Sequence, residues 1–130
     1  MHIKDLTGKA IATIEANFAL LSGVDELAGQ LGVAKCHLIR AFKSQAGLTP
    51  GQYLVSTRIK AAKLILCHRA YSVEAVANMV GYSGANYFCK VFRRAVGESP
   101  HAWRARQAQP PALSDTEKTL IEYLDRLSHT

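Results

Sequence analysis

The sequence has no long apolar run and no apolar leader, so two broad classes of protein can be set aside first. Apolar runs such as 64–66 are only a few residues long, whereas a membrane-spanning helix needs roughly 20 consecutive apolar residues. Lys4, Asp5 and Lys9 interrupt the N-terminal segment, where a signal peptide would need an unbroken apolar core. We therefore expect a protein without membrane contact that stays in the cytoplasm.

Cysteine pairs and catalytic motifs are also missing. The three cysteines, Cys36, Cys67 and Cys89, show no C-x-x-C spacing and indicate free thiols. Cysteine and histidine are adjacent at 36–37 and at 67–68. Two neighbouring residues on a helix point about 100° apart, so neither pair alone forms a metal site. No Gly-rich phosphate loop, carboxylate pair or nucleophile with a base stands out. We expect no metal, no cofactor, no small-molecule ligand and no enzymatic activity; a redox role of Cys36 or Cys89 stays open.

What the sequence does contain is a strongly uneven distribution of charge. Residues 34–106 carry twelve Lys or Arg and only two acids, Glu74 and Glu98, which gives a net charge of +10. Residues 1–33 and 107–130 each carry −2, so the whole chain has +6 at pH 7. A basic middle between acidic flanks favours a surface that binds a polyanion.

The spacing of apolar residues predicts helices along most of the chain. The first helix has an apolar face made of Leu6, Ala10, Ile14, Phe18 and Leu21. A short second helix is expected to be capped by Ser22 with Asp25 and to end at Gly32. A third covers about 35–46. A longer helix to about His68 would measure roughly 28 Å, at 1.5 Å per residue.

The second half of the chain repeats the first. GVDELAGQLGV at 23–33 matches SVEAVANMVGY at 72–82, and the helices that follow align at an offset of 50 residues. GLTPGQY at 47–53 returns as GESPHAW at 97–103. In both, Gly ends one helix, and Thr or Ser followed by Pro begins the next. A duplicated three-helix unit joined by one long helix is the simplest architecture.

We therefore predict an all-α fold with two helix-turn-helix subdomains joined by a long linker helix, plus an extra C-terminal helix. Residues 1–48 hold the N-terminal helix and first unit, 49–68 the linker helix, and 69–106 the second unit. Residues 107–130 hold a Pro-containing linker and a C-terminal amphipathic helix. Pro110–Pro111 interrupt helical structure, and Ser114 and Glu117 form a capping box at the start of the last helix. The apolar face of 113–128 is expected to pack on the first helix, with a dimer contact or a docking site for a partner as the alternative.

A short helix, a tight turn and a second helix with an exposed basic face are typical of a helix-turn-helix, whose second helix enters the DNA major groove. Several blocks occur here in a characteristic order: ELAGQLGVAKCHLIRAFKSQAGLTPGQYL, RIKAAKLIL and SVEAVANMVGYSGANYFCKVFRRAVGESPHAWR. From about residue 6 to 105, the chain resembles the AraC/XylS family of bacterial transcription regulators.

The resemblance implies a sequence-specific regulator that inserts two recognition helices into successive major grooves of double-stranded promoter DNA. It also implies contact with RNA polymerase and a place on the nucleoid in the cytoplasm. A non-enzymatic helical module that binds another protein is the alternative.

Base contacts in this family come from the exposed face of each recognition helix. The corresponding positions here are Cys36, Ile39, Arg40, Ala85, Asn86 and Lys90. Arg40 has the chemistry to bind guanine, and Asn86 to bind adenine, each through two hydrogen bonds. The phosphate-contact candidates are Lys35, His37, Lys43, Arg93, Arg94 and, at a helix N-terminus, Ser72. Arg58 on the linker helix is expected to be structural.

Overall fold

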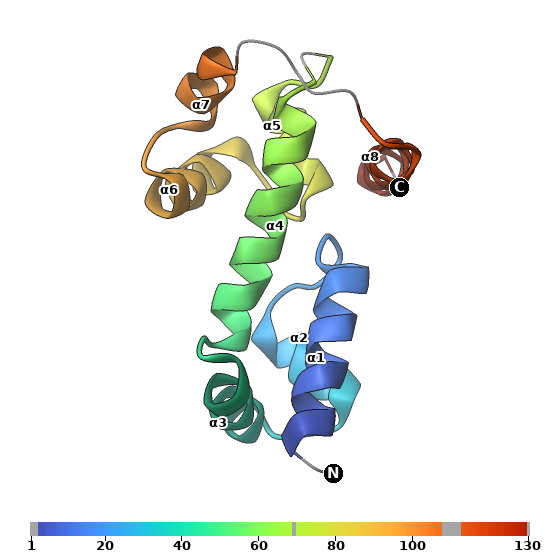
Figure 1. Cartoon of the computed structure of the whole chain (residues 1–130), viewed down its shortest axis with the longest axis vertical. Coiled ribbons are helices and arrows are strands. Elements are labelled where there is room, and N and C mark those ends of the chain that lie inside the picture. The colour runs from blue at the N-terminus through green and yellow to red at the C-terminus, as the bar shows by residue number, and fades with distance from the viewer. Residues whose placement is uncertain (1–2, 69, 108–112, 130) are drawn as a thin grey trace. The chain divides into compact units, whose positions relative to one another are not determined.

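The computed structural model describes residues 3–68, 70–107 and 113–129. Its regular elements in these ranges are all helices, so the predicted all-α fold is confirmed (Figure 1). The chain divides into two compact units, Met1–Arg58 and Ile59–Thr130. Helix α4 (Pro50–Leu66) crosses the boundary without interruption. None of the described helices is long and apolar enough to cross a membrane.

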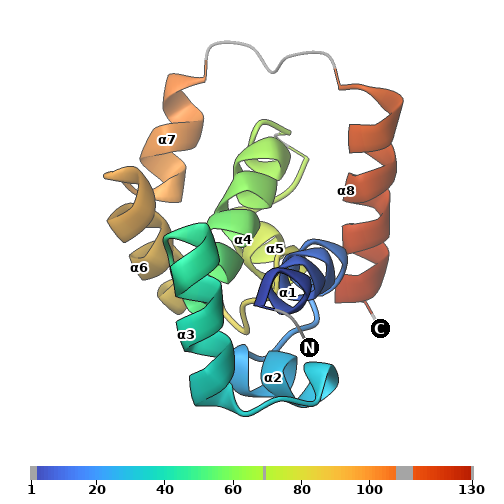
Figure 2. The same cartoon turned by 60° about the horizontal axis from the view of Figure 1, so that its bottom comes forward.

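Unit 1 is built around three helices: α1 (Ile3–Asn17), α2 (Val24–Leu31) and α3 (Lys35–Ala46). Each of them packs on the other two (Figures 1 and 2). The predicted apolar face of the first helix is buried in full, and it meets the inner faces of α2 and α3. The buried apolar side chains of these helices and their connections are Leu6, Ala10, Ile14, Phe18, Leu21, Leu27, Ala28, Leu38, Ala41 and Phe42.

Only the C-terminal end of α2 agrees with the sequence analysis. Gly32 ends the helix in the left-handed conformation, with φ of 70°, as predicted. The predicted cap at Ser22 is wrong, because Gly23 occupies the N-cap position and no side chain caps the helix. Ser22 lies one residue too early, and its hydroxyl instead donates to the Glu26 carboxylate at 2.9 Å.

Helix α4 starts as predicted and is tied to unit 1 near its first turn. The Thr49 hydroxyl accepts the Gln52 N–H at 3.1 Å, and the Gln52 side chain accepts the Thr49 N–H at 2.9 Å. The Tyr53 ring contacts Phe42 edge-on, with ring centres 5.7 Å apart. The Tyr53 hydroxyl donates to Glu15 at 2.6 Å. This bond, with burial and the Glu15 charge, raises the pKa of the Tyr53 phenol.

Arg58 on α4 is structural, as expected. Only 7% of the residue is exposed, and its guanidinium donates to the Phe18 carbonyl at 3.0 Å and also to the Leu21 carbonyl. Both carbonyls lie just beyond α1, whose last turn has no basic residue of its own. Arg58 therefore supplies a charged donor to two buried carbonyls in the chain that follows α1.

Unit 2 contains the rest of α4 with α5 (Val73–Met79), α6 (Ala85–Val96), α7 (Pro100–Arg106) and α8 (Asp115–Ser128). Helix α5 packs on α6 and α8, and α6 packs on α7. A row of aromatic contacts runs through the unit. The ring centres of Phe88 and Phe92 are 5.7 Å apart, and those of Phe92 and Trp103 are 6.1 Å apart. Trp103 on α7 therefore packs within unit 2.

Arg104 on α7 is a structural residue that the sequence analysis missed. Its guanidinium donates to the carbonyls of Leu66, His68 and Tyr71, at 2.8, 3.3 and 2.6 Å. These carbonyls belong to the end of α4 and the chain that leads to α5. Arg104 thus does for α4 what Arg58 does for α1.

Helix α8 begins with the predicted capping box, in which Ser114 accepts the Glu117 N–H and Glu117 accepts the Ser114 N–H. Ile121 and Leu124 on its inner face are 4% and 1% exposed. Helix α5 packs on α8; the expected packing of α8 on the first helix, which belongs to the other unit, stays a prediction. Pro110–Pro111 lies outside the described residues.

Replacing Arg58 by alanine should lower the free energy of unfolding by about 2 kcal/mol, because two carbonyls lose a charged donor. Urea unfolding followed by far-UV circular dichroism measures the change. Lys9→Ala, which removes an exposed positive charge from the same unit, is the control and should leave the curve unchanged. Equal curves for both variants would contradict the structural role of Arg58.

Candidate nucleic-acid interface

In unit 1, α3 separates an inner apolar face from an outer polar one. Leu38 and Phe42 are fully buried on the inner side. Five of the predicted contact residues are exposed on the outer side: Lys35, Cys36, His37, Arg40 and Lys43. Ile39 is only half-buried and lies at the margin of this face. The structure therefore brings the predicted positions of the first unit onto one side of one helix.

In unit 2, α6 has the same division. Phe88 and Phe92 are fully buried, whereas Asn86, Lys90, Arg93 and Arg94 are exposed. Ala85 is half-buried at the start of the helix, so only part of its small side chain is available to a thymine methyl group. Tyr87, which the sequence analysis did not single out, is 60% exposed.

The two recognition helices are alike in length and in register. Both have 12 residues, and both end at a glycine 50 positions apart, Gly47 and Gly97. These glycines have φ of 83° and 97°, a left-handed conformation that residues other than glycine rarely adopt. Their N–H groups bond to the carbonyls of Lys43 and Arg93 at 2.9 and 2.8 Å. Arg40 and Lys90 therefore occupy equivalent positions in the two units.

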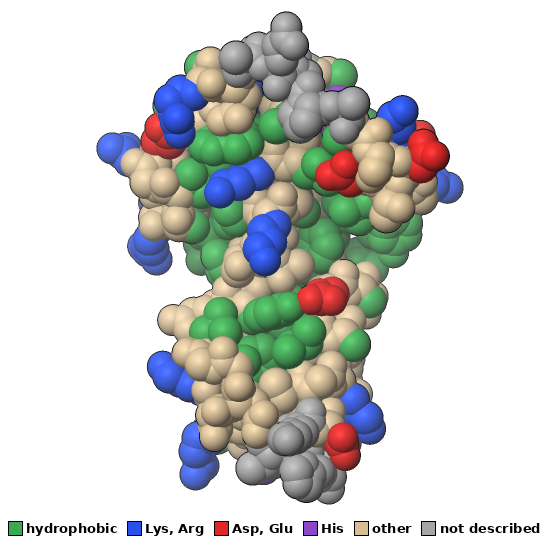
Figure 3. Space-filling model, viewed as in Figure 1, with side chains coloured by type: hydrophobic (Ala, Val, Ile, Leu, Met, Phe, Trp, Pro, Cys, Tyr) green, Lys and Arg blue, Asp and Glu red, His purple; other side chains and the backbone are tan. Residues whose placement is uncertain are grey.

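The cations of the two outer faces differ in their partners. Lys35 forms an ion pair with Asp25 of α2 at 3.1 Å, so part of its charge is already balanced within the protein. Arg40, Lys43, Lys90, Arg93 and Arg94 form no ion pair with a described residue. Figure 3 shows Lys and Arg side chains on the outer surfaces of α3, α4 and α6. Each outer face, taken by itself, suits the negatively charged backbone of a nucleic acid.

Ser72, the remaining phosphate candidate, is the N-cap of α5. Its hydroxyl accepts the Ala75 N–H at 3.0 Å, so its side chain is already used by the helix. The Ser72 O–H can still donate to a phosphate bound at this place, beside the backbone N–H groups of the first turn.

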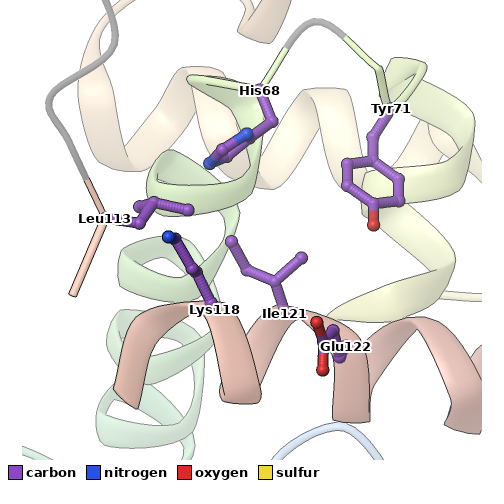
Figure 4. Close-up of a pocket in the computed structure, with 6 residues that line it drawn as sticks. All are labelled: His68, Tyr71, Leu113, Lys118, Ile121 and Glu122. Carbon is purple, nitrogen blue, oxygen red and sulfur yellow. The ribbon is translucent and has the colours of Figure 1, made fainter. Parts of the chain in front are cut away.

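A small cavity of about 160 Å³ lies on the α8 side of unit 2 (Figure 4). His68, Tyr71, Leu113, Lys118, Ile121 and Glu122 line it. Burial, followed by the charges of Asp125 and Glu122, raises the pKa of the Tyr71 phenol. The cavity contains none of the predicted contact residues. Over the described part of the chain, no three His, Cys, Asp or Glu side chains are grouped to hold a metal ion.

Known proteins share this arrangement. A family model described as a helix-turn-helix domain matches residues 27–106, more than half of the chain. The HTH-type transcriptional activator RhaS of Escherichia coli O9:H4 (strain HS) is 37% identical over 90 residues, which are 69% of this chain and 32% of RhaS. In general, this chain spans about a third of the length of the curated relatives it matches.

Two solved structures have the same fold. The first is a transcriptional regulator of Chromobacterium violaceum with an AraC-type DNA-binding domain; it has a TM-score of 0.70 and 27% identity, with 83% of this chain and 96% of that chain covered. The second, the DNA-binding domain of AdpA in complex with a target DNA, has a TM-score of 0.67 and 30% identity, with 76% and 89% covered.

The fold and its two exposed helices define a helix-turn-helix protein. The chain belongs to the AraC/XylS family of bacterial transcription regulators, so the resemblance seen in the sequence is confirmed. DNA binding in the regulation of transcription is the activity of this family.

Replacing Asp25 by asparagine should strengthen binding to duplex DNA several-fold, because Lys35 then becomes free to neutralise a phosphate. The slope of log affinity against log salt should steepen by about 0.9, the value for one further phosphate contact. Fluorescence anisotropy over a salt series measures both quantities. Glu122→Gln, which removes an exposed acid from α8, is the control. An unchanged slope in Asp25→Asn would show that Lys35 takes no part in DNA binding.

Proposed function

We propose that this chain is a sequence-specific DNA-binding part of a bacterial transcription regulator, whose helices α3 and α6 enter successive major grooves of promoter DNA. The observation that carries the proposal is the duplication: two units present equivalent recognition helices with exposed, largely unpaired cations. These helices lie in a segment with a net charge of +10. A cationic outer face on one helix is common, but the same face at equivalent positions in two units is what two half-sites require.

Within each recognition helix, the middle of the outer face is the place for base readers. Arg40 and Lys90 lie there at equivalent positions, and Asn86 lies one turn before Lys90. Arginine or lysine pairs with guanine, and asparagine pairs with adenine. Cys36 is exposed and small, and Ile39 and Ala85 are half-buried, so these three positions offer only limited apolar contact to thymine methyl groups.

Cations nearer the edges of the face are assigned to phosphates. Lys43, Arg93 and Arg94 are exposed and have no charged partner among the described residues. His37 is exposed as well, and its ring nitrogen can donate to a phosphate oxygen. Lys35 is a weaker candidate because of its ion pair with Asp25.

RNA polymerase is the second partner that we propose, because RhaS is named an activator and activation requires the polymerase at the promoter. The site of action would be chromosomal DNA in the cytoplasm.

A dimer contact through residues 113–128 also stays a prediction. Ile121 and Leu124 are buried inside unit 2, so the contact would have to use the outer face of α8, where Tyr123 is 42% exposed. Light scattering on the wild type and a Tyr123→Ser variant tests this contact. A dimer that the substitution dissociates would support it, and a monomeric wild type would exclude it.

The competing function, a helical module that binds another protein, makes a different prediction about salt. A DNA-binding chain with several phosphate contacts loses duplex affinity steeply as salt rises, by about 0.9 in log–log slope for each phosphate. Duplex binding that is absent or independent of salt would favour the protein-binding module.

Substituting base readers and phosphate contacts should have different effects. Arg40→Ala and Asn86→Ala should each reduce discrimination at one base pair by about 1–3 kcal/mol, because a bidentate contact is lost. Lys43→Ala and Arg93→Ala should weaken binding to all duplexes equally and reduce the salt slope by about one. Competition between a preferred duplex and its single-base variants measures the difference. Equal losses of Arg40→Ala on preferred and random duplexes would show that Arg40 does not read bases.

A further inference from the structure

Tyr87 is a large, exposed side chain on a recognition helix that has no role in the site described so far. It is 60% exposed, and it occupies the position equivalent to His37 in the other unit, 50 residues earlier. Both units therefore place a ring that carries a hydrogen-bonding group at the third position of the recognition helix.

The position of Tyr87 around α6 places it at the edge of the outer face. Successive residues of a helix are turned by about 100°, so the direction opposite Phe88 and Phe92 is that of Lys90. Tyr87 lies about 60° to one side of Lys90, in nearly the same direction as Arg94, two turns further along. A helix in the major groove directs the middle of its outer face to the bases and its edges to the two phosphate backbones.

A second tyrosine supports the ring of Tyr87. The Tyr82 ring, in the connection between α5 and α6, lies 5.8 Å away at an angle of 60°. Tyr82 is itself 8% exposed and contacts the buried Phe88 at 5.6 Å. The Tyr87 ring is thus held on one side, while more than half of the residue remains open to a partner. A tyrosine side chain has only two torsions, and one side of this ring is already held by Tyr82. The side chain therefore loses little conformational entropy when it binds a partner.

From these observations we infer that Tyr87 is a DNA-positioning residue whose phenol donates a hydrogen bond to a phosphate at the edge of the groove occupied by α6. The inference rests on the proposed function. Because the phenol is neutral, its contact releases no counterion, which separates it from the contacts of Arg93 and Arg94. A phosphate contact carries no sequence information, so Tyr87 strengthens binding without selecting bases.

Tyr87→Phe tests the inference, because it removes only the hydroxyl and keeps the ring on Tyr82. Affinity for a preferred duplex and for a random 25-base-pair duplex should fall by the same factor, about ten- to a hundred-fold, the effect of one hydrogen bond to a charged acceptor. The salt slope should not change. Tyr71→Phe, which removes the hydroxyl of a half-buried tyrosine that lies outside the candidate contact residues, is the matched control and should bind as the wild type does. Thermal unfolding of each variant checks that the fold is kept.

Two outcomes would overturn the role of Tyr87 and leave the proposed function intact: wild-type affinity in Tyr87→Phe, or a loss confined to the preferred duplex. The first would mean that only the ring counts, and the second that Tyr87 reads a base. If the wild type itself binds no duplex at low salt, the proposed function fails and the role of Tyr87 fails with it.

Discussion

In both units the recognition helix is held in place by a buried phenylalanine that meets the aromatic ring of the following helix. Phe42 contacts Tyr53 in unit 1, and Phe92 contacts Trp103 in unit 2. Both phenylalanines are fully buried, so neither recognition helix can turn about its axis without exposing a large apolar surface, at a cost of about 25 cal/mol for each Å². This constraint fixes which residues face outward. The positions of Arg40 and Lys90 on the outer face follow from it.

The outer faces of the two duplicated units differ in their charges and in the residue types that they present. Unit 1 balances Lys35 with Asp25 and carries Glu26 in the same turn of α2. In unit 2, Arg93 and Arg94 form no ion pair with a described residue, and an amide, Asn86, takes the place of Cys36. We infer that unit 2 supplies the larger share of the electrostatic attraction, and that the two units prefer different base sequences. The proposed binding site is therefore asymmetric.

Much of the fold could be predicted from the sequence, because local signals decided it. Gly47, Thr49 and Pro50 mark a helix boundary through their own backbone and hydroxyl chemistry, and the duplication repeats the signal at Gly97. The N-cap of α2 was predicted at Ser22, one residue too early, because spacing alone does not show whether a serine or the glycine that follows it begins the helix. The candidate contact residues could be placed on the outer faces of α3 and α6, because the helical period and the apolar spacing together show which residues point inward and which point outward.

Contacts between distant parts of the chain could not be predicted in the same way. Arg104 meets carbonyls more than 30 residues away, and nothing in its immediate sequence separates it from a solvent-exposed arginine. The pairing of Asp25 with Lys35 depends on how α2 meets α3. The packing of α5 on α8 was not predicted, because amphipathic spacing shows that a face is buried but not what covers it.

The central claim is that both units read DNA at the same time, one in each of two successive major grooves. Selecting bound sites from a random duplex library tests it most directly, because the selected sequences record every base position that the chain reads. The account predicts two different conserved blocks at a fixed separation of about ten base pairs, one turn of DNA. A single block, or two blocks whose separation varies, would contradict it.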